Sequence, residues 1–134
     1  MALFDLASRI KPVFGFTSTV GTANVNTVAC DTAGFESVTV AFSAGAGNID
    51  ENIYAVPYLY ESDDNTRANA TAVPVVRIDN VPNVNEANTT FWASFVPVKR
   101  YVFAEIDPVG GHMGTPITAT FILGDAHDQP TTLG

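Results

Sequence analysis

Apolar and polar residues alternate along much of the chain, and the alternation is clearest over residues 35–43. Val38, Val40 and Phe42 occupy one set of positions there, and Ser, Thr or Ala occupies the other. This two-residue period is typical of a half-buried β-strand. Other segments of strand composition are residues 24–29, 53–60, 73–78, 91–96, 101–106 and 117–123.

Turn-forming residues separate these segments. Gly, Pro, Asn and Asp gather at residues 31–34, 45–48, 62–65, 79–83 and 107–111. Short strands with turns at regular intervals are typical of β-sandwiches and barrels, and short connections favour antiparallel pairing. We therefore predict an all-β fold: a single-domain antiparallel β-sandwich or barrel of about seven to eight strands with an N-terminal arm.

The segment 53–60 carries a proline at position 57. Proline cannot donate a ladder hydrogen bond, so this strand is predicted to lie at a sheet edge or to contain a bulge at Pro57. Its alternation places Tyr54, Tyr58 and Tyr60 on one face and Leu59 on the other.

Residues 1–16 precede the recognisable strands and are too apolar to remain solvated. We expect them to form an N-terminal arm or a first strand, with the β-sandwich over residues 17–128 and a flexible polar tail over 129–134. A helical spacing at Leu3, Leu6 and Ile10 covers only about two turns, which is marginal in isolation. Packing on the same domain and burial against a neighbouring protein both remain open.

The amino-acid composition disfavours some classes of binding partner. Fourteen acidic residues against six basic ones give a net charge of −8, which disfavours binding to nucleic acid phosphates. Charged residues make up 15% of the chain, below the usual value of about 25%, so the surface is only lightly protected against association. The lone Cys30 gives no sign of a disulfide scaffold. We see no signal peptide and no apolar run long enough to span a bilayer, and we expect no membrane partner.

No catalytic motif is present. The chain lacks a Gly-x-Ser-x-Gly elbow, a His-Glu-x-x-His motif and a phosphate-binding loop. His112 and His127 have side chains that could bind a metal together with Asp125 and Asp128, but the spacing of the four residues matches no known set of metal ligands. We therefore predict no enzymatic activity, no cofactor and no metal site.

Two aromatic residues, Phe91 and Trp92, occupy adjacent positions in a predicted strand, so one ring points inward and the other outward. Aromatic residues are enriched at the centres of protein interfaces. We favour a protein contact over a glycan contact for the outward ring. The predicted interface residues are Phe4, Leu6, Ile10, Phe14, Phe16 and Trp92.

Three segments resemble a loose family of small tailed-phage virion proteins. An early turn and strand reads Asp-Thr-Ala-Gly-Phe-Glu-Ser-Val at 31–38, and a later strand opens with Lys-Arg-Tyr-Val at 99–102. The ending at 123–130 matches the pattern Leu-Gly-x-x-His-x-x-Pro. The chain departs from the family once, because Phe103 stands where a basic or polar residue is expected.

The resemblance implies a non-enzymatic phage structural protein, in particular a capsid decoration or cement protein. Such a protein would bind and stabilise the outer face of the shell formed by the phage major capsid protein. It would be a homo-oligomer, with a trimer as one arrangement, made in the bacterial cytoplasm and located on the outer capsid surface of the virion. A head-tail connector or tail component, and a carbohydrate-binding module for host attachment that uses Trp92 and the tyrosines, are the alternatives.

Overall fold

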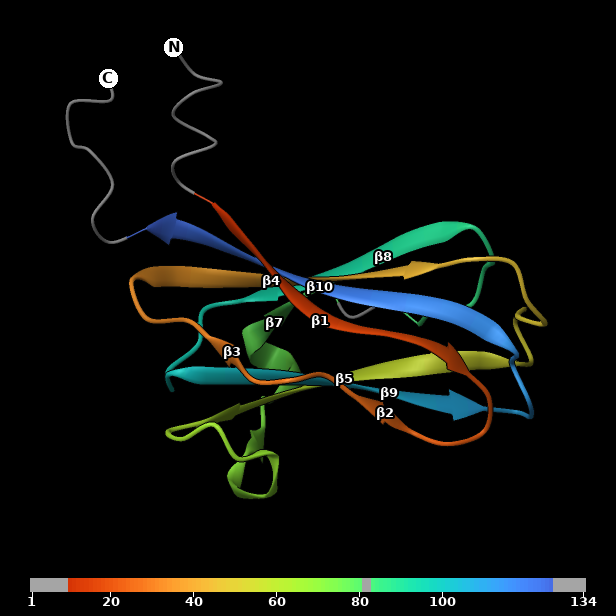
Figure 1. Cartoon of the computed structure of the whole chain (residues 1–134), viewed down its shortest axis with the longest axis horizontal. Helices are drawn as coiled ribbons and strands as arrows, with labels where there is room; N and C mark the ends of the chain where they lie inside the picture. Colours follow the sequence, from red (N-terminus) through yellow and green to blue (C-terminus); the bar gives the residue numbers. More distant parts are fainter. Residues whose placement is uncertain (1–9, 81–82, 127–134) are drawn as a thin grey trace, which may run out of the picture.

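Two antiparallel β-sheets face each other across one hydrophobic core (Figure 1). The computed structural model describes residues 10–80 and 83–126. The predicted all-β class is confirmed, and the fold is a β-sandwich.

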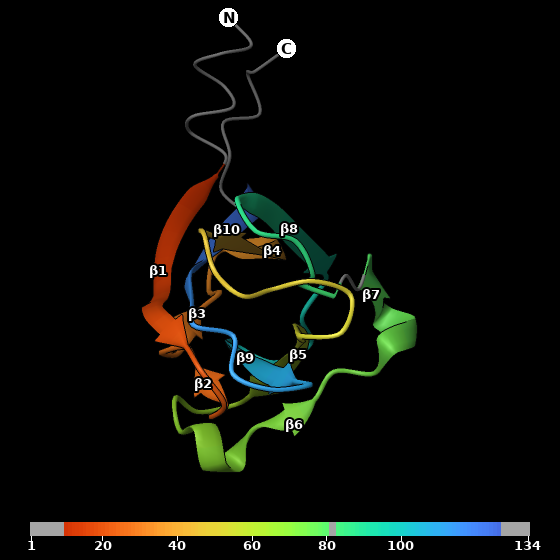
Figure 2. The same cartoon turned by 90° about the vertical axis from the view of Figure 1, so that its right-hand side faces the viewer.

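Sheet A contains five strands, and sheet B lies beneath it in the end-on view of Figure 2. In spatial order, sheet A consists of β1 (Lys11–Val20), β10 (Thr115–Ala126), β4 (Phe35–Ala44), β8 (Thr89–Phe95) and β7 (Ile78–Asp79). Sheet B consists of β2 (Val25–Asn26), β9 (Tyr101–Val109), β5 (Tyr54–Ser62) and β6 (Thr71–Ala72), and β3 (Cys30–Asp31) also pairs with β9.

The structure contains ten strands within the described residues, and four of them (β2, β3, β6 and β7) are only two residues long. The strand predicted at residues 73–78 is wrong for most of its length, because Val75–Arg77 form the short 3-10 helix η2. Pro74 caps this helix with φ −59°, and Arg77 donates its backbone N–H to the Pro74 carbonyl at 2.9 Å. A proline thus starts a turn where the apolar residues alone indicate a strand. A second 3-10 helix, η1 (Arg67–Asn69), lies between β5 and β6.

The core is formed by the inward positions that the alternation predicts. On β4, Val38, Val40 and Phe42 are fully buried, and Phe121 and Leu123 of the neighbouring β10 are buried beside them. β10 pairs with β1 on one side and β4 on the other, so it is an interior strand of the sheet. Burial of large apolar side chains, at about 25 cal/mol per Å², is the main stabilising contribution.

The edge position predicted from Pro57 is confirmed. β5 pairs with β9 along its whole length, but on its other side β6 reaches only as far as Tyr60. Ala55 donates its N–H to the Val84 carbonyl on that outer side at 3.0 Å, and alternation directs the Pro57 nitrogen the same way. The missing donor therefore lies at an open part of the sheet edge.

β1 begins within the expected N-terminal segment and pairs with β10, and the expected boundary at residue 16 falls inside this strand. A β-bulge lies between Phe14 and Phe16. A Cβ added at Gly15 would lie 2.6 Å from the Ala119 carbonyl oxygen, so the close approach at the bulge requires glycine. Residues 1–9 and the tail at 129–134 lie outside the described residues.

A buried ion pair joins the two layers next to η2. Glu61 of β5 is 3% exposed and accepts hydrogen bonds from Arg77 and from the Val98 N–H, the latter at 3.0 Å. Burial alone would raise the pKa of Glu61, but these donors outweigh it and hold the pKa below its ordinary value. Arg77 also donates to the Val96 carbonyl at 3.0 Å, beyond the end of β8. The pair therefore links sheet B to the edge of sheet A.

Candidate interaction surface

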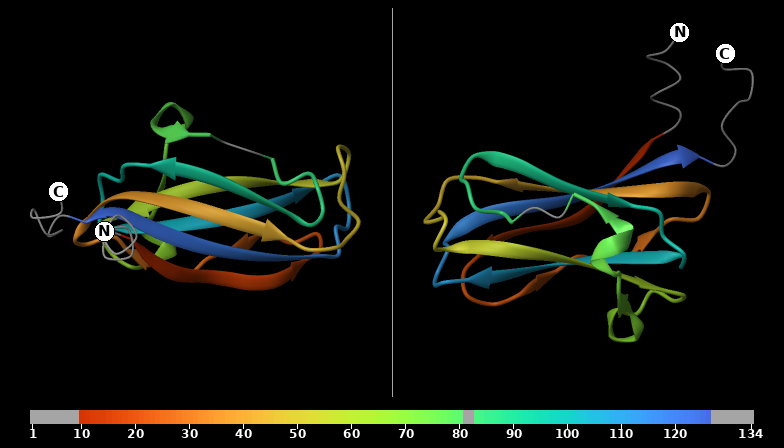
Figure 3. Two further views of the ribbon diagram at one scale, coloured as in Figure 1. Left: turned by 90° about the horizontal axis from the view of Figure 1, so that it is seen from above. Right: turned by 180° about the vertical axis from the view of Figure 1, so that it is seen from behind.

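Among the described side chains, the outer face of sheet A carries no charged group across its four long strands. Figure 3 shows this sheet from above. Its outward residues, called face A below, are Pro12, Phe14, Thr17, Thr39, Ala41, Ser43, Thr90, Trp92, Ser94, Thr118, Thr120 and Ile122. Charged residues border the face only at strand ends and at its β7 edge, where Lys11, Glu36 and Asp79 lie. An uncharged face of this extent is unusual in a protein with a net charge of −8.

Two exposed aromatic rings lie in one row across face A. The strand register aligns Phe14 with Thr120, Thr120 with Ala41, and Ala41 with Trp92. Phe14 is 61% exposed on β1 and Trp92 is 54% exposed on β8. The two small residues between them leave a low stretch of surface flanked by large rings, an arrangement that suits contact with another protein.

Six hydroxyl groups of face A form three hydrogen-bonded pairs. Thr17 and Thr118 share a hydrogen bond of 3.1 Å between β1 and β10. Between β4 and β8, Thr39 pairs with Ser94 at 2.8 Å and Ser43 pairs with Thr90 at 3.0 Å. A buried hydroxyl is costly mainly when it lacks a partner, so these pairs lower the free-energy cost of removing face A from water.

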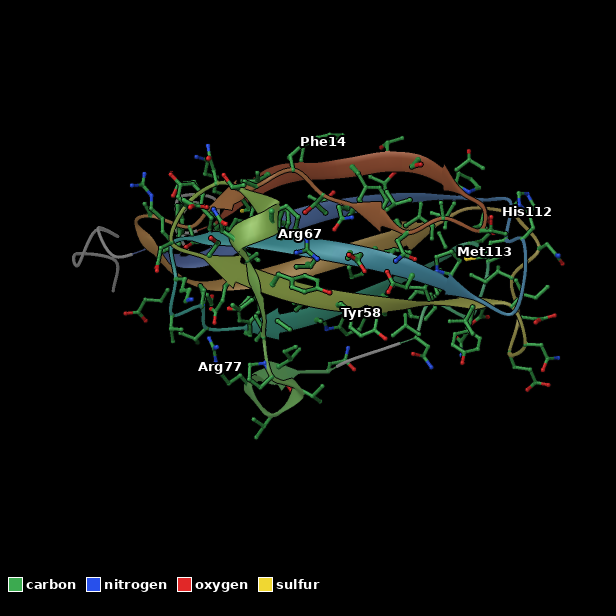
Figure 4. All side chains as sticks on the ribbon, turned by 90° about the horizontal axis from the view of Figure 1, so that it is seen from below. Phe14, Tyr58, Arg67, Arg77, His112 and Met113 are labelled. Atoms are coloured by element: carbon green, nitrogen blue, oxygen red, sulfur yellow. The ribbon has the colours of Figure 1, made fainter. Side chains whose placement is uncertain are left out.

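The outer face of sheet B, called face B below, is built around Arg67 of η1. The Arg67 guanidinium stacks 3.6 Å from the ring centroid of Tyr60 on β5. It also donates to Glu105 of β9 at 3.1 Å and to the Asn26 side-chain oxygen of β2 at 2.9 Å. Figure 4 shows this face from below, with Arg67 and Tyr58 labelled. One arginine thus holds the connection between β5 and β6 against the sheet.

Face B also contains two neighbouring carboxyl groups. Asp107 follows Glu105 by two residues on β9, so their side chains share a face. One side-chain oxygen of Asp107 is buried with no hydrogen-bond partner. Burial, followed by a hydrogen bond with Glu105 and the negative charge of Glu105, raises the pKa of Asp107 to about 7, against a smaller opposing effect of Arg67. Face B therefore changes charge near neutral pH.

The structure distributes the predicted interface residues unevenly. Phe14 and Trp92 lie together on face A, and Ile10, 39% exposed, precedes β1. Phe16 is 7% exposed and packs in the core, because the bulge at Gly15 moves it to the inner side of β1. Phe4 and Leu6 lie outside the described residues.

The aromatic residues considered for a glycan site do not form one group. Trp92 lies on face A, whereas Tyr58, 45% exposed, lies on face B with the thickness of the sandwich between them. No single ligand can therefore stack on both rings. Within residues 10–80 and 83–126, no group of three His, Cys, Asp or Glu residues is placed to hold a metal ion. His112 lies in the loop before β10, and His127 lies outside the described part of the chain.

A second group of exposed apolar residues surrounds the Arg77–Glu61 pair. Val75 and Val76 of η2 are 70% and 91% exposed, and Val96 and Val98 after β8 are 62% and 72% exposed. Sequence analysis missed this group because its members come from two separate segments. The hydroxyl pairs of face A were missed for the same reason, although the Thr and Ser positions on four strands were a visible signal.

Comparison with known proteins finds structures of similar fold but identifies no family. No protein-family model and no curated protein matches the chain. Among solved structures, it is similar to the SPBc2 prophage-derived protein YomS, with a TM-score of 0.51 and 16% identity over 85% of this chain and 91% of that one. It is also similar to the D431N mutant of VP2 from infectious bursal disease virus in T=1 particles, with a TM-score of 0.53 and 10% identity.

The VP2 match covers 90% of this chain and 32% of VP2, so the present chain spans about a third of that protein. At these identities the likeness shows a shared fold alone. A search of the described residues found no helix of the length and apolarity needed to cross a membrane.

Proposed function

We propose that the chain is a non-enzymatic structural protein of a tailed-phage particle, a decoration or cement protein on the outer face of the major capsid protein shell. The observation that carries the proposal is face A: exposed aromatic rings at Phe14 and Trp92 on an uncharged surface where six hydroxyls form three hydrogen-bonded pairs. Such a surface loses little when it is desolvated in an assembly. The occurrence of this fold in a prophage-derived protein and in a viral particle protein is consistent with the proposal.

The protein would act through burial at contacts that exist only in the assembled shell. A component that binds the assembled state and not the separated subunits stabilises the shell by mass action. Face A provides one contact by which a copy joins the particle. Ile10, together with Phe4 and Leu6 before it in sequence, provides a second apolar contact, directed at the capsid protein.

The test uses capsids purified without this protein, to which the purified chain is added back. We expect saturating protein to co-sediment with the shells and to raise their melting temperature in a calorimetric scan. For the Trp92→Ala variant, the protein concentration needed to stabilise the shells should rise at least about tenfold. The matched control is Tyr58→Ala, which removes an aromatic ring of similar exposure from the opposite face and should bind like the unaltered chain.

The copy number separates the decoration role from the alternatives. Hundreds of copies per particle in cryo-electron microscopy fit a shell protein, whereas about a dozen copies at one vertex would identify a head-tail or tail component. An unchanged melting temperature with saturating protein would contradict the cement role.

A further inference from the structure

We propose that face A is the surface on which two copies of this chain associate face to face about a two-fold axis. The inference rests on the proposed function and deepens it, because it names the neighbour that covers face A. The neighbour is a second copy of this chain, and the capsid protein is contacted elsewhere on the molecule.

The charge distribution favours a second copy on this face. Each copy carries a net charge of −8, so two copies repel each other in most orientations. Face B presents the carboxyl groups of Glu105 and Asp107, and the loop after β5 presents Asp63 and Asp64. Face A contains no charged side chain, and two such faces can meet without placing carboxylates opposite each other.

The row of residues across face A is suited to self-pairing. A two-fold axis parallel to the strands, between Ala41 and Thr120, exchanges the two ends of the row. It therefore places Phe14 of each copy opposite Trp92 of the other, and the same contact is made twice, as in any isologous interface.

The hydroxyl pairs of face A lower the free-energy cost of removing it from water when two copies associate. Three hydroxyl pairs, led by Thr39 with Ser94 at 2.8 Å, each share one hydrogen bond within a copy. Each pair therefore has one O–H left to place, where two unpaired hydroxyls would have two. This reduces the polar cost of the contact, and the aromatic rings supply its apolar area.

The size of the face sets the strength of the association. Four strands about 4.8 Å apart and about eight residues long at roughly 3.3 Å each offer an area on the order of 500 Å² per copy. A standard stable interface buries about 800 Å² per partner, so we expect a reversible dimer that forms at high micromolar concentration. On a particle, the effective concentration of anchored copies is far higher, and the same contact becomes populated there.

The experiment is sedimentation equilibrium of the full chain from about 1 µM to about 1 mM. We expect a monomer–dimer equilibrium for the unaltered chain. Phe14→Ala and Trp92→Ala should each weaken dimerisation at least about tenfold. Ala41→Glu, which places two carboxylates near the two-fold axis, should leave only monomer. Tyr58→Ala on face B is the matched control and should dimerise normally. Circular dichroism and thermal unfolding check that every variant is folded.

A chain that stays monomeric up to about 1 mM, or a dimer that Ala41→Glu and Trp92→Ala leave intact, would overturn the inference. Capsid binding distinguishes its failure from failure of the proposed function. Monomeric protein whose capsid binding is lost in Ala41→Glu would mean that face A contacts the capsid protein, so the function would stand and the dimer would not. A face-A dimer that never binds capsids would leave the dimer standing and remove the function.

Discussion

The two outer faces of this sandwich both belong to antiparallel sheets but have opposite chemistry. On face A, polar side chains from adjacent strands bond to each other, as Thr39 does with Ser94. On face B, the polar side chains depend on a loop that reaches over the sheet, because Arg67 stacks on Tyr60 and pairs with Glu105. Face A is uncharged, whereas face B includes an aspartate whose pKa is raised to about 7.

The difference shows that a small β-protein can leave one sheet face uncovered while a loop is held against the other. Short hydroxyl side chains satisfy each other at the distance set by strand pairing, so face A needs no covering segment and stays available to a partner. The long charged side chains of face B need a fixed counter-group, and the arginine that provides it also fixes the loop between β5 and β6. Face A is therefore the side on which a neighbour is expected.

The largest expected effect comes from uncoupling the two sheets. Arg77→Ala removes the positive charge beside the buried carboxylate of Glu61 and leaves it with backbone N–H donors from Val98 and Lys99, and we expect a loss of about 3 kcal/mol in the free energy of unfolding. Arg100→Ala is the control, since its partner Asp31 is half exposed and the pair should contribute less than about 1 kcal/mol. Urea denaturation measures both, and equal losses would contradict the assignment of Arg77 as the linking residue.

The next effect is a pH dependence that originates on face B. The pKa of Asp107 is raised from 3.8 to about 7 in the folded chain, so the folded state holds an extra proton between those values. Stability due to this group is therefore present at about pH 4 and is lost as the pH rises through about 7. Asp107→Asn should flatten the profile in that window when chemical denaturation is repeated across pH.

The groups with lowered pKa values act in a different window. Hydrogen bonds from Arg100 and the Ala33 N–H lower the pKa of Asp31 to about 2, and the pKa of Glu61 is lowered as well. Both groups lose their contributions to the free energy of unfolding as the pH falls below about 4. Their effect therefore does not overlap with that of Asp107. A slope between pH 4 and 7 that persists in Asp107→Asn would assign the titration to another group.

A smaller effect is expected when the loop on face B is released. Arg67→Ala removes the stacking on Tyr60 and the ion pair with Glu105, both partly exposed, and should cost about 1 kcal/mol. Hydrogen exchange should become faster in residues 63–70 and stay unchanged in β4. Arg67→Lys retains a charge without the stacked plane and should give an intermediate rate. Unchanged exchange in Arg67→Ala would show that other contacts hold the loop.

The smallest effect is expected on face A itself. The double change Thr39→Val and Ser94→Ala removes both members of one hydroxyl pair and leaves no partner unsatisfied. We expect the free energy of unfolding to change by no more than about 0.5 kcal/mol, measured in urea beside the unaltered chain. A loss of about 2 kcal/mol would mean that the hydroxyl pairs of face A stabilise the folded chain, and that their role is not limited to lowering the cost of burying the face.

Local patterns were sufficient to predict much of the fold. The alternation around Val38, Val40 and Phe42 predicted β4 and its buried face, and Pro57 predicted an open edge. These inferences depend only on neighbouring residues in one strand, where the period of two decides which side chain is buried. The alternation also predicted that one ring of the pair Phe91 and Trp92 points outward, and the structure shows that it is Trp92.

Features that depend on pairing between distant segments could not be predicted. Phe14 and Phe16 are two residues apart, so simple alternation puts them on one side, but the extra residue at the Gly15 bulge sends Phe16 into the core. The alignment of Phe14 with Trp92 requires the register of four strands. The link between Arg77 and Glu61 depends on a proline-started helix that replaced a predicted strand.

Pro57 has a consequence for the proposed assembly of many copies. Crowded β-proteins are at risk of runaway polymerisation, in which the free edge of one sheet templates the next through backbone hydrogen bonds. At the open part of β5, the chain offers a nitrogen that cannot donate, so an incoming strand would meet a gap in the ladder. In the proposed assembly, Pro57 therefore protects neighbouring copies from fusing into fibres along that edge.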